Sequence, residues 1–103
     1  MLPLIESRRE EIAELCRRYH VLRLEVFGSA ARVADFDPAG SDVDLLVTFD
    51  PAAAPPDLEA YFDLGDRLSS LLGHPVDLVM SGAVRNPIVA RDIDRWKQPV
   101  YAA

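Results

Sequence analysis

Two aspartates separated by a single residue open a strongly apolar stretch of the chain. Asp42 and Asp44 flank Val43, and the apolar run 45–47 follows directly. Because side chains alternate along a β-strand, both carboxylates would lie on one face of it. Their oxygens suit Mg²⁺, which proteins often hold through one or two carboxylates together with substrate phosphates. Asp is depleted in strands, so a pair of them here indicates function rather than structure.

A glycine and a serine precede this pair and could bind phosphate. Gly28 and Ser29 end a strand-like run, and glycine lets backbone N–H groups approach a ligand closely. Ser29 is also a good N-cap for a short helix over 29–33, whose N-terminus would favour an anion. Arg32 either reaches the phosphates with its guanidinium group or stays on the surface beside an acidic residue of the next loop. Together these parts predict a site for a Mg²⁺-bound nucleoside triphosphate.

A third carboxylate, Asp77, lies inside the apolar run 76–79. It could simply face solvent, or it could join Asp42 and Asp44 in a cluster of three. Clustered carboxylates cannot all stay ionised at low cost without a cation, which again favours Mg²⁺. Asp35 and Asp37 lie in a loop with proline and glycine, where turn formation is the simpler interpretation.

The pattern of Gly28-Ser29, a spacer, Asp42-x-Asp44 and an apolar strand resembles the signature of the nucleotidyltransferase superfamily that includes DNA polymerase beta. The short chain and the form GSAAR are similar to its minimal nucleotidyltransferase (MNT) branch. The likeness extends over nearly the whole chain. It departs from the family pattern in Val33, where many members have glycine, and in a longer spacer.

This resemblance implies a role for each site residue. Asp42 and Asp44 would be metal ligands, and Asp77 would be the third ligand and a possible general base. Gly28 and Ser29 would hold the β- and γ-phosphates, with Arg32 as a further nucleotide contact. The cofactor would be Mg²⁺, with two ions expected, and the substrate ATP. A hydroxyl would attack the α-phosphorus and pyrophosphate would leave.

The resemblance also implies a partner. MNT proteins commonly occur beside HEPN proteins in toxin–antitoxin pairs, where the MNT member transfers AMP to a tyrosine of the HEPN RNase and silences it. An antitoxin of this kind is the expected function. Two alternatives stay open: a non-catalytic antitoxin that blocks its toxin by binding, and a nucleotidyltransferase that modifies a small molecule such as an antibiotic. A non-enzymatic metal-binding domain is the fallback.

Length and composition limit the classes of protein. With 103 residues, half of them apolar, the chain is expected to form one domain, residues 1–103. A net charge of −6 argues against a direct nucleic-acid grip, which needs clustered Lys and Arg. Cys16 is the single cysteine, so no internal disulfide is expected and a cytoplasmic location is the default. No apolar stretch is long enough to span a membrane, and the first residues do not resemble a signal peptide.

The elements expected to position the site alternate between helix and strand. Periodicity and capping predict helices over 4–19, 29–33, 57–72 and 87–96, and strands over 21–27, 42–48, 76–80 and 99–103. Asp57 is the expected N-cap of the third helix and Gly73 its end. Tyr61, Phe62, Trp96 and Tyr101 are expected to pack inside. This order predicts an α/β (α+β) fold in which helices pack on a small mixed sheet, similar to the nucleotidyltransferase fold.

Overall fold

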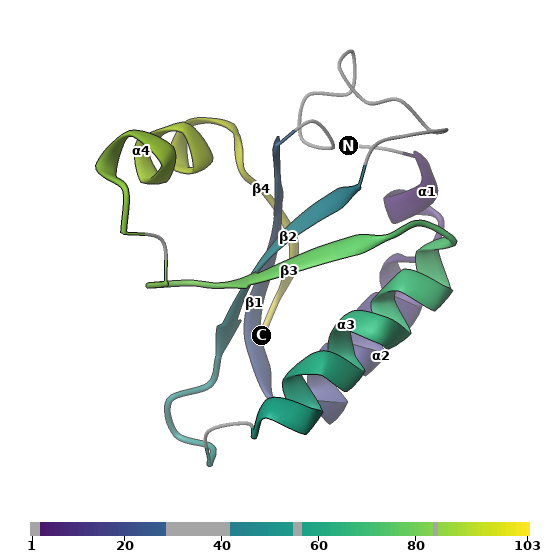
Figure 1. The fold of residues 1–103 in the computed structure, drawn as a ribbon. Helices are drawn as coiled ribbons and strands as arrows, with labels where there is room; N and C mark the ends of the chain where they lie inside the picture. The colour runs from purple at the N-terminus through teal and green to yellow at the C-terminus, as the bar shows by residue number, and fades with distance from the viewer. Residues whose placement is uncertain (1–2, 29–41, 55–56, 84) are drawn as a thin grey trace.

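Four strands form one mixed sheet in the computed structural model, which describes residues 3–28, 42–54, 57–83 and 85–103 (Figure 1). The strands are β1 (Val21–Phe27), β2 (Val43–Phe49), β3 (Val76–Met80) and β4 (Gln98–Ala102). The helices are α1 (Pro3–Glu6), α2 (Arg9–Arg18), α3 (Leu58–Leu72) and α4 (Pro87–Trp96). The expected fold class is confirmed, and most expected elements lie within two residues of their observed bounds.

The strand order β3-β2-β1-β4 places the helices on both faces of the sheet. β1 is antiparallel to β2 and β4, whereas β2 and β3 are parallel, so β2, β3 and β4 all run in one direction. Parallel crossovers are almost always right-handed. The chain moves from β2 to β3 in one direction and from β3 to β4 in the other, so α3 and α4 fall on opposite faces. Figure 1 shows α3 beside α2 on one side and α4 on the other.

The hydrophobic core fills the space between the sheet and the helices α2 and α3. Alternate residues of the two central strands point into it, while Leu64 and Leu68 of α3 pack from above with Cys16 of α2. The strand residues that do so are Leu24, Val26, Val43, Leu45 and Val47. Because strand side chains alternate, the residues between them point to the opposite face. That face carries Glu25, Asp44 and Asp77, and we call it the carboxylate face.

Local signals account for the bounds of α3 and α4. Asp57 caps α3, its carboxylate accepting a hydrogen bond from the Ala60 N–H at 2.7 Å. Gly73 ends the helix in the left-handed conformation, with φ of 69°. Asn86 caps α4 by accepting from the Ile88 N–H at 2.9 Å, and Pro87 occupies the first turn. The boundaries Asp57 and Gly73 were predicted from the sequence, whereas the Asn86 cap was not; both helices lie where they were expected.

Several expectations about the elements were wrong. The first helix is divided at Ser7 and Arg8 into α1 and α2. Phe62 is 58% exposed instead of buried, because it lies about 100° round the helix from Tyr61 and outside the inward stripe. Trp96 is 39% exposed and so only partly packed, whereas Tyr61 and Tyr101 do pack against the core. The expected helix over 29–33 lies outside the described residues.

None of the helices in the described ranges has the length and apolar character required to cross a membrane. α3 is the longest of them and has fifteen residues. Its exposed side carries charged residues such as Asp66 and Arg67.

Candidate functional site

A row of three residues crosses the sheet at one end of the carboxylate face. Phe27 of β1 pairs with Asp44 of β2, and Asp44 pairs with Asp77 of β3. Neighbouring strands are about 4.8 Å apart, so the two carboxylates project side by side from adjacent strands. Asp42 lies directly before β2 and is exposed. The structure therefore brings Asp44 and Asp77 together, with Asp42 at the same end of the sheet.

Gly28 closes this end of the sheet directly after β1. Its φ of +67° is one that side-chain-bearing residues rarely adopt. A Cβ atom built on it would lie 2.3 Å from Asp44 Oδ2, far inside van der Waals contact. Both observations require glycine here. The missing side chain leaves the backbone after β1 directly against the Asp44 carboxylate.

The Asp44 carboxylate is partly buried and lies near two like charges. Burial raises the pKa of its carboxyl group, and the negative charges of Asp77 and Asp42 raise it further. Within the described ranges, no Lys or Arg forms an ion pair with Asp44 or Asp77. Among the residues that the structure describes, no positive charge is therefore paired with the ionised Asp44 and Asp77.

A divalent cation fits this shortage, and Asp44 and Asp77 could hold it. In the part of the chain that the structure describes, no three His, Cys, Asp or Glu side chains close around a single point. Mg²⁺ does not need such a cage, since one or two carboxylates together with substrate phosphates commonly bind it. The two aligned carboxylates are the right donors for that arrangement, and Asp42 remains a predicted third ligand from the protein.

The phosphate side of the predicted site is only partly described. Ser29 and Arg32, the two expected phosphate contacts after Gly28, lie outside the described residues, as do Asp35 and Asp37. Their assigned roles therefore stay predictions. Gly28 is the one phosphate-side residue for which the structure supplies geometry.

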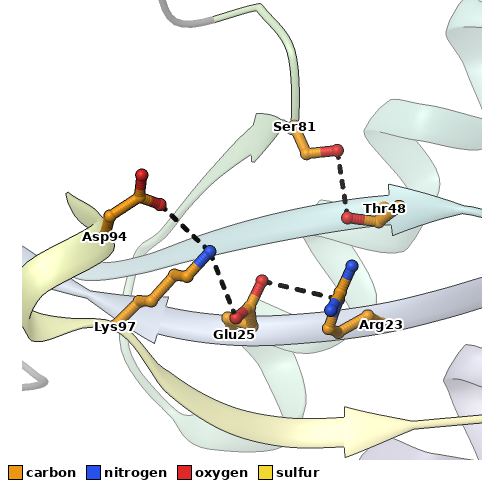
Figure 2. Close-up of polar contacts among 6 residues, drawn as sticks. All are labelled: Arg23, Glu25, Thr48, Ser81, Asp94 and Lys97. Atoms are coloured by element: carbon orange, nitrogen blue, oxygen red, sulfur yellow. Dashed lines mark hydrogen bonds and ion pairs between the residues drawn. The ribbon is translucent and has the colours of Figure 1, made fainter. Parts of the chain in front are cut away.

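Sequence reasoning missed a buried ion pair on the same face. Glu25 is 7% exposed and lies 3.7 Å from Lys97 Nζ and 3.7 Å from Arg23 Nε (Figure 2). Lys97 also lies 3.1 Å from Asp94. A glutamate two residues before Phe27 in an alternating strand was the available signal, because period two places it on the face of Asp44. Nothing local to the sequence indicated that Lys97, seventy-two positions later, would contact it.

Most of the chain is similar in sequence to known nucleotidyltransferase-type proteins. The family model described as nucleotidyltransferase domain matches residues 9–100. A protein of Methanocaldococcus jannaschii, MJ0128, named "putative protein adenylyltransferase", is 41% identical over 80 residues, which cover 78% of this chain and 76% of that protein. Two more proteins of that organism with the same kind of name, MJ0126 and MJ1217, are 33% and 34% identical over 89 residues.

Solved structures show the same fold. A structure described as a putative minimal nucleotidyltransferase superposes with a TM-score of 0.73 at 34% identity, and the match covers 91% of this chain and 90% of that one. A chain from the complex of a tri-AMPylated Shewanella oneidensis HEPN toxin with an MNT antitoxin gives a TM-score of 0.66 at 21% identity. That match covers 96% of this chain and 73% of the other, and at this identity it supports the fold alone.

Replacing Asp44 with asparagine should stabilise the metal-free protein at neutral pH. The folded-state pKa of Asp44 is raised, so its contribution favours folding below the pKa of the unfolded chain and is lost as pH rises through the folded value. At pH 7 in EDTA, we expect Asp44→Asn to unfold a few degrees higher than wild type. The difference should shrink near pH 3, where both forms are neutral.

Asp66→Asn is the matched control, because Asp66 is an exposed carboxylate on α3. Its thermal midpoint should stay within error of wild type. Adding Mg²⁺ should stabilise wild type more than Asp44→Asn. A lower midpoint for Asp44→Asn in EDTA would contradict the charge repulsion inferred here.

Gly28→Ala should destabilise the fold for two separable reasons. The positive φ alone costs about 1–2 kcal/mol for a residue with a Cβ atom, and the contact with Asp44 adds to that. Gly73→Ala is a matched control, since its φ is +69° and nothing lies within 4 Å of an added Cβ. We expect Gly28→Ala to cost more than Gly73→Ala in urea unfolding. The excess should fall when Asp44→Ala is added, and equal costs for the two glycines would rule out the contact.

Proposed function

The chain belongs to the nucleotidyltransferase domain family, and on that basis we propose that it transfers AMP from ATP to a tyrosine hydroxyl of a partner HEPN-family toxin, thereby neutralising it. One observation carries the proposal. Asp44 and Asp77 project side by side from adjacent strands, with Gly28 directly against Asp44. That arrangement suits a substrate that brings both phosphates and a counter-charge, which is what Mg²⁺-bound ATP does.

Each described site residue has a distinct task in this reaction. The backbone at Gly28 admits the ATP phosphates, because no side chain blocks the approach. Asp44 and Asp77 would hold Mg²⁺ with Asp42, and the bound ion would supply positive charge to the phosphate oxygens. Ser29 and Arg32 are proposed to complete the phosphate contacts.

The bond changes follow from this placement. The acceptor oxygen attacks the α-phosphorus of ATP, and the bond from that phosphorus to the leaving pyrophosphate breaks. Asp77 is exposed and lies on the edge strand of the sheet, so it is the carboxylate that an incoming protein can reach. We assign it the role of accepting the hydroxyl proton.

The choice of acceptor is supported by the relatives and by charge. The M. jannaschii protein is named as a protein adenylyltransferase, and the S. oneidensis complex holds an AMPylated HEPN toxin beside an MNT antitoxin. A net charge of −6 suits association with a basic partner protein and disfavours nucleic acid. We propose that the pair acts in the cytoplasm, where the buried Cys16 would stay reduced.

Mass spectrometry tests the transfer directly. The chain is mixed with the HEPN protein encoded beside it, ATP and Mg²⁺, and the partner is weighed. We expect the partner to gain the mass of one or more AMP units, with loss of the gain in EDTA. Asp77→Asn keeps the side-chain volume and removes one charge, and it should lower the rate about 100-fold or more, because it removes stabilisation of charge that develops in the transition state.

The same variants separate catalysis from binding. Asp77→Asn should still co-purify with the toxin, while Asp66→Asn should transfer AMP at the wild-type rate. In cells, Asp77→Asn should fail to neutralise the toxin. Full neutralisation by Asp77→Asn would overturn the enzymatic account and favour inhibition by binding alone.

A further inference from the structure

α4 is held to the rest of the protein by few apolar contacts. Of its ten residues only Ile93 is buried, while Ile88 is 78% and Val89 46% exposed. Of the helices in the described ranges, α4 alone lies on the carboxylate face, away from α2 and α3 (Figure 1). Burial of a single isoleucine contributes little to fix a whole helix in position. β4 follows α4 directly, and its pairing with β1 holds the C-terminal end of the helix, where a side-chain interaction adds to this support.

The ion pair between Glu25 and Lys97 supplies that interaction. Lys97 is the C-terminal cap of α4, and its ammonium group lies 3.7 Å from Glu25 and 3.1 Å from Asp94. Figure 2 shows Lys97 reaching from the end of α4 to the Glu25 carboxylate on β1. Glu25 is the one buried charged residue among those described, and a buried charge is strongly unfavourable without a partner. Glu25 has two cationic partners, Arg23 and Lys97, each 3.7 Å away, and of these Lys97 links it to the end of α4.

The Glu25–Lys97 ion pair lies on the same face of the sheet as Asp44 and Asp77. Glu25 pairs with Leu46 across the sheet and Phe27 pairs with Asp44, so Glu25 and Asp44 are diagonal neighbours on one face, about 7–8 Å apart. Gln98 pairs with Val26, so Lys97 stands one residue further along, level with the row that contains Asp44 and Asp77. The pair therefore fastens the C-terminal end of α4 beside the site.

We propose that Glu25 and Lys97 are positioning residues for AMP transfer: their ion pair holds α4 in the position in which it contacts the acceptor protein bound at Asp77. This inference rests on the proposed function. We assign neither residue a contact with ATP or with the reacting atoms. They act through α4, the one described helix on the carboxylate face. A displacement of about 1 Å in the position of the acceptor can lower the rate about 100-fold.

The inference predicts a split between nucleotide binding and transfer. In Glu25→Gln and in Lys97→Met, AMP transfer to the partner should fall about 10- to 100-fold, while the affinity for Mg²⁺-ATP changes by less than about twofold. Lys97→Met keeps most of the aliphatic stem and removes only the charge. Lys97→Arg should keep near wild-type transfer, and the exchange Glu25→Lys with Lys97→Glu should recover part of it.

Trp96 provides a readout that does not depend on the acceptor. It is the single tryptophan of the chain and the last residue of α4, directly before Lys97. Acrylamide quenching of its fluorescence should increase in Glu25→Gln and Lys97→Met and stay at the wild-type level in Lys97→Arg. Arg67→Gln is the matched control, because it breaks the ion pair to Asp63 on α3 and leaves the carboxylate face intact.

Each other outcome contradicts the inference. Wild-type transfer in both variants, or a loss of Mg²⁺-ATP affinity in parallel with transfer, would overturn the positioning role. Unfolding of both variants in circular dichroism would assign the pair a purely structural role. If the wild-type chain transfers no AMP, the proposed function fails and the catalytic part of the inference with it, whereas unchanged Trp96 quenching in the variants refutes the anchor alone.

Discussion

Repulsion between two carboxylates on neighbouring strands is the constraint on which this structure depends. Asp44 and Asp77 face one another across a parallel strand pair; burial raises the pKa of Asp44, and the negative charge of Asp77 raises it further. Such a pair opposes folding of the metal-free chain. The core between the sheet and the helices α2 and α3 must offset that opposition, which leaves the carboxylate face free to serve a ligand. The site is therefore maintained at a cost in stability, as functional sites often are.

The topology explains how a small chain accommodates this. The crossover through α3 makes β2 and β3 parallel neighbours, and their starts come to the end of the sheet where antiparallel β1 finishes at Gly28. Among the described residues, Asp44 and Asp77 thus meet Gly28 at this end of the sheet. The crossover from β3 to β4 runs across the sheet in the opposite direction and brings α4 onto the same face as the carboxylates. There, Lys97 meets Glu25. The proposed nucleotide side and the proposed acceptor side of the site are consequently built from successive parts of one chain.

Local signals in the sequence predicted most elements, and long-range contacts account for what they could not predict. The caps Asp57 and Gly73 are local, and the third helix was located correctly. Period-two alternation placed Asp44 on one face, but only the strand register shows Asp77 beside it. Phe62 is exposed because it lies outside the inward stripe of α3, although it was expected to pack together with Tyr61. The contact of Glu25 with Lys97 joins β1 to the end of α4 and leaves no local trace.

Titration of ATP into the protein by calorimetry, with Mg²⁺ and with EDTA, tests whether a metal ion bridges the carboxylates and the phosphates. If Asp44 and Asp77 need a cation before phosphates can approach, wild type should bind ATP in Mg²⁺ and lose nearly all measurable affinity in EDTA, since the triphosphate would then face unneutralised carboxylates. Asp44→Asn should show a much smaller difference between the two buffers. Equal ATP affinity of the wild-type chain in Mg²⁺ and in EDTA would contradict a metal-bridged site.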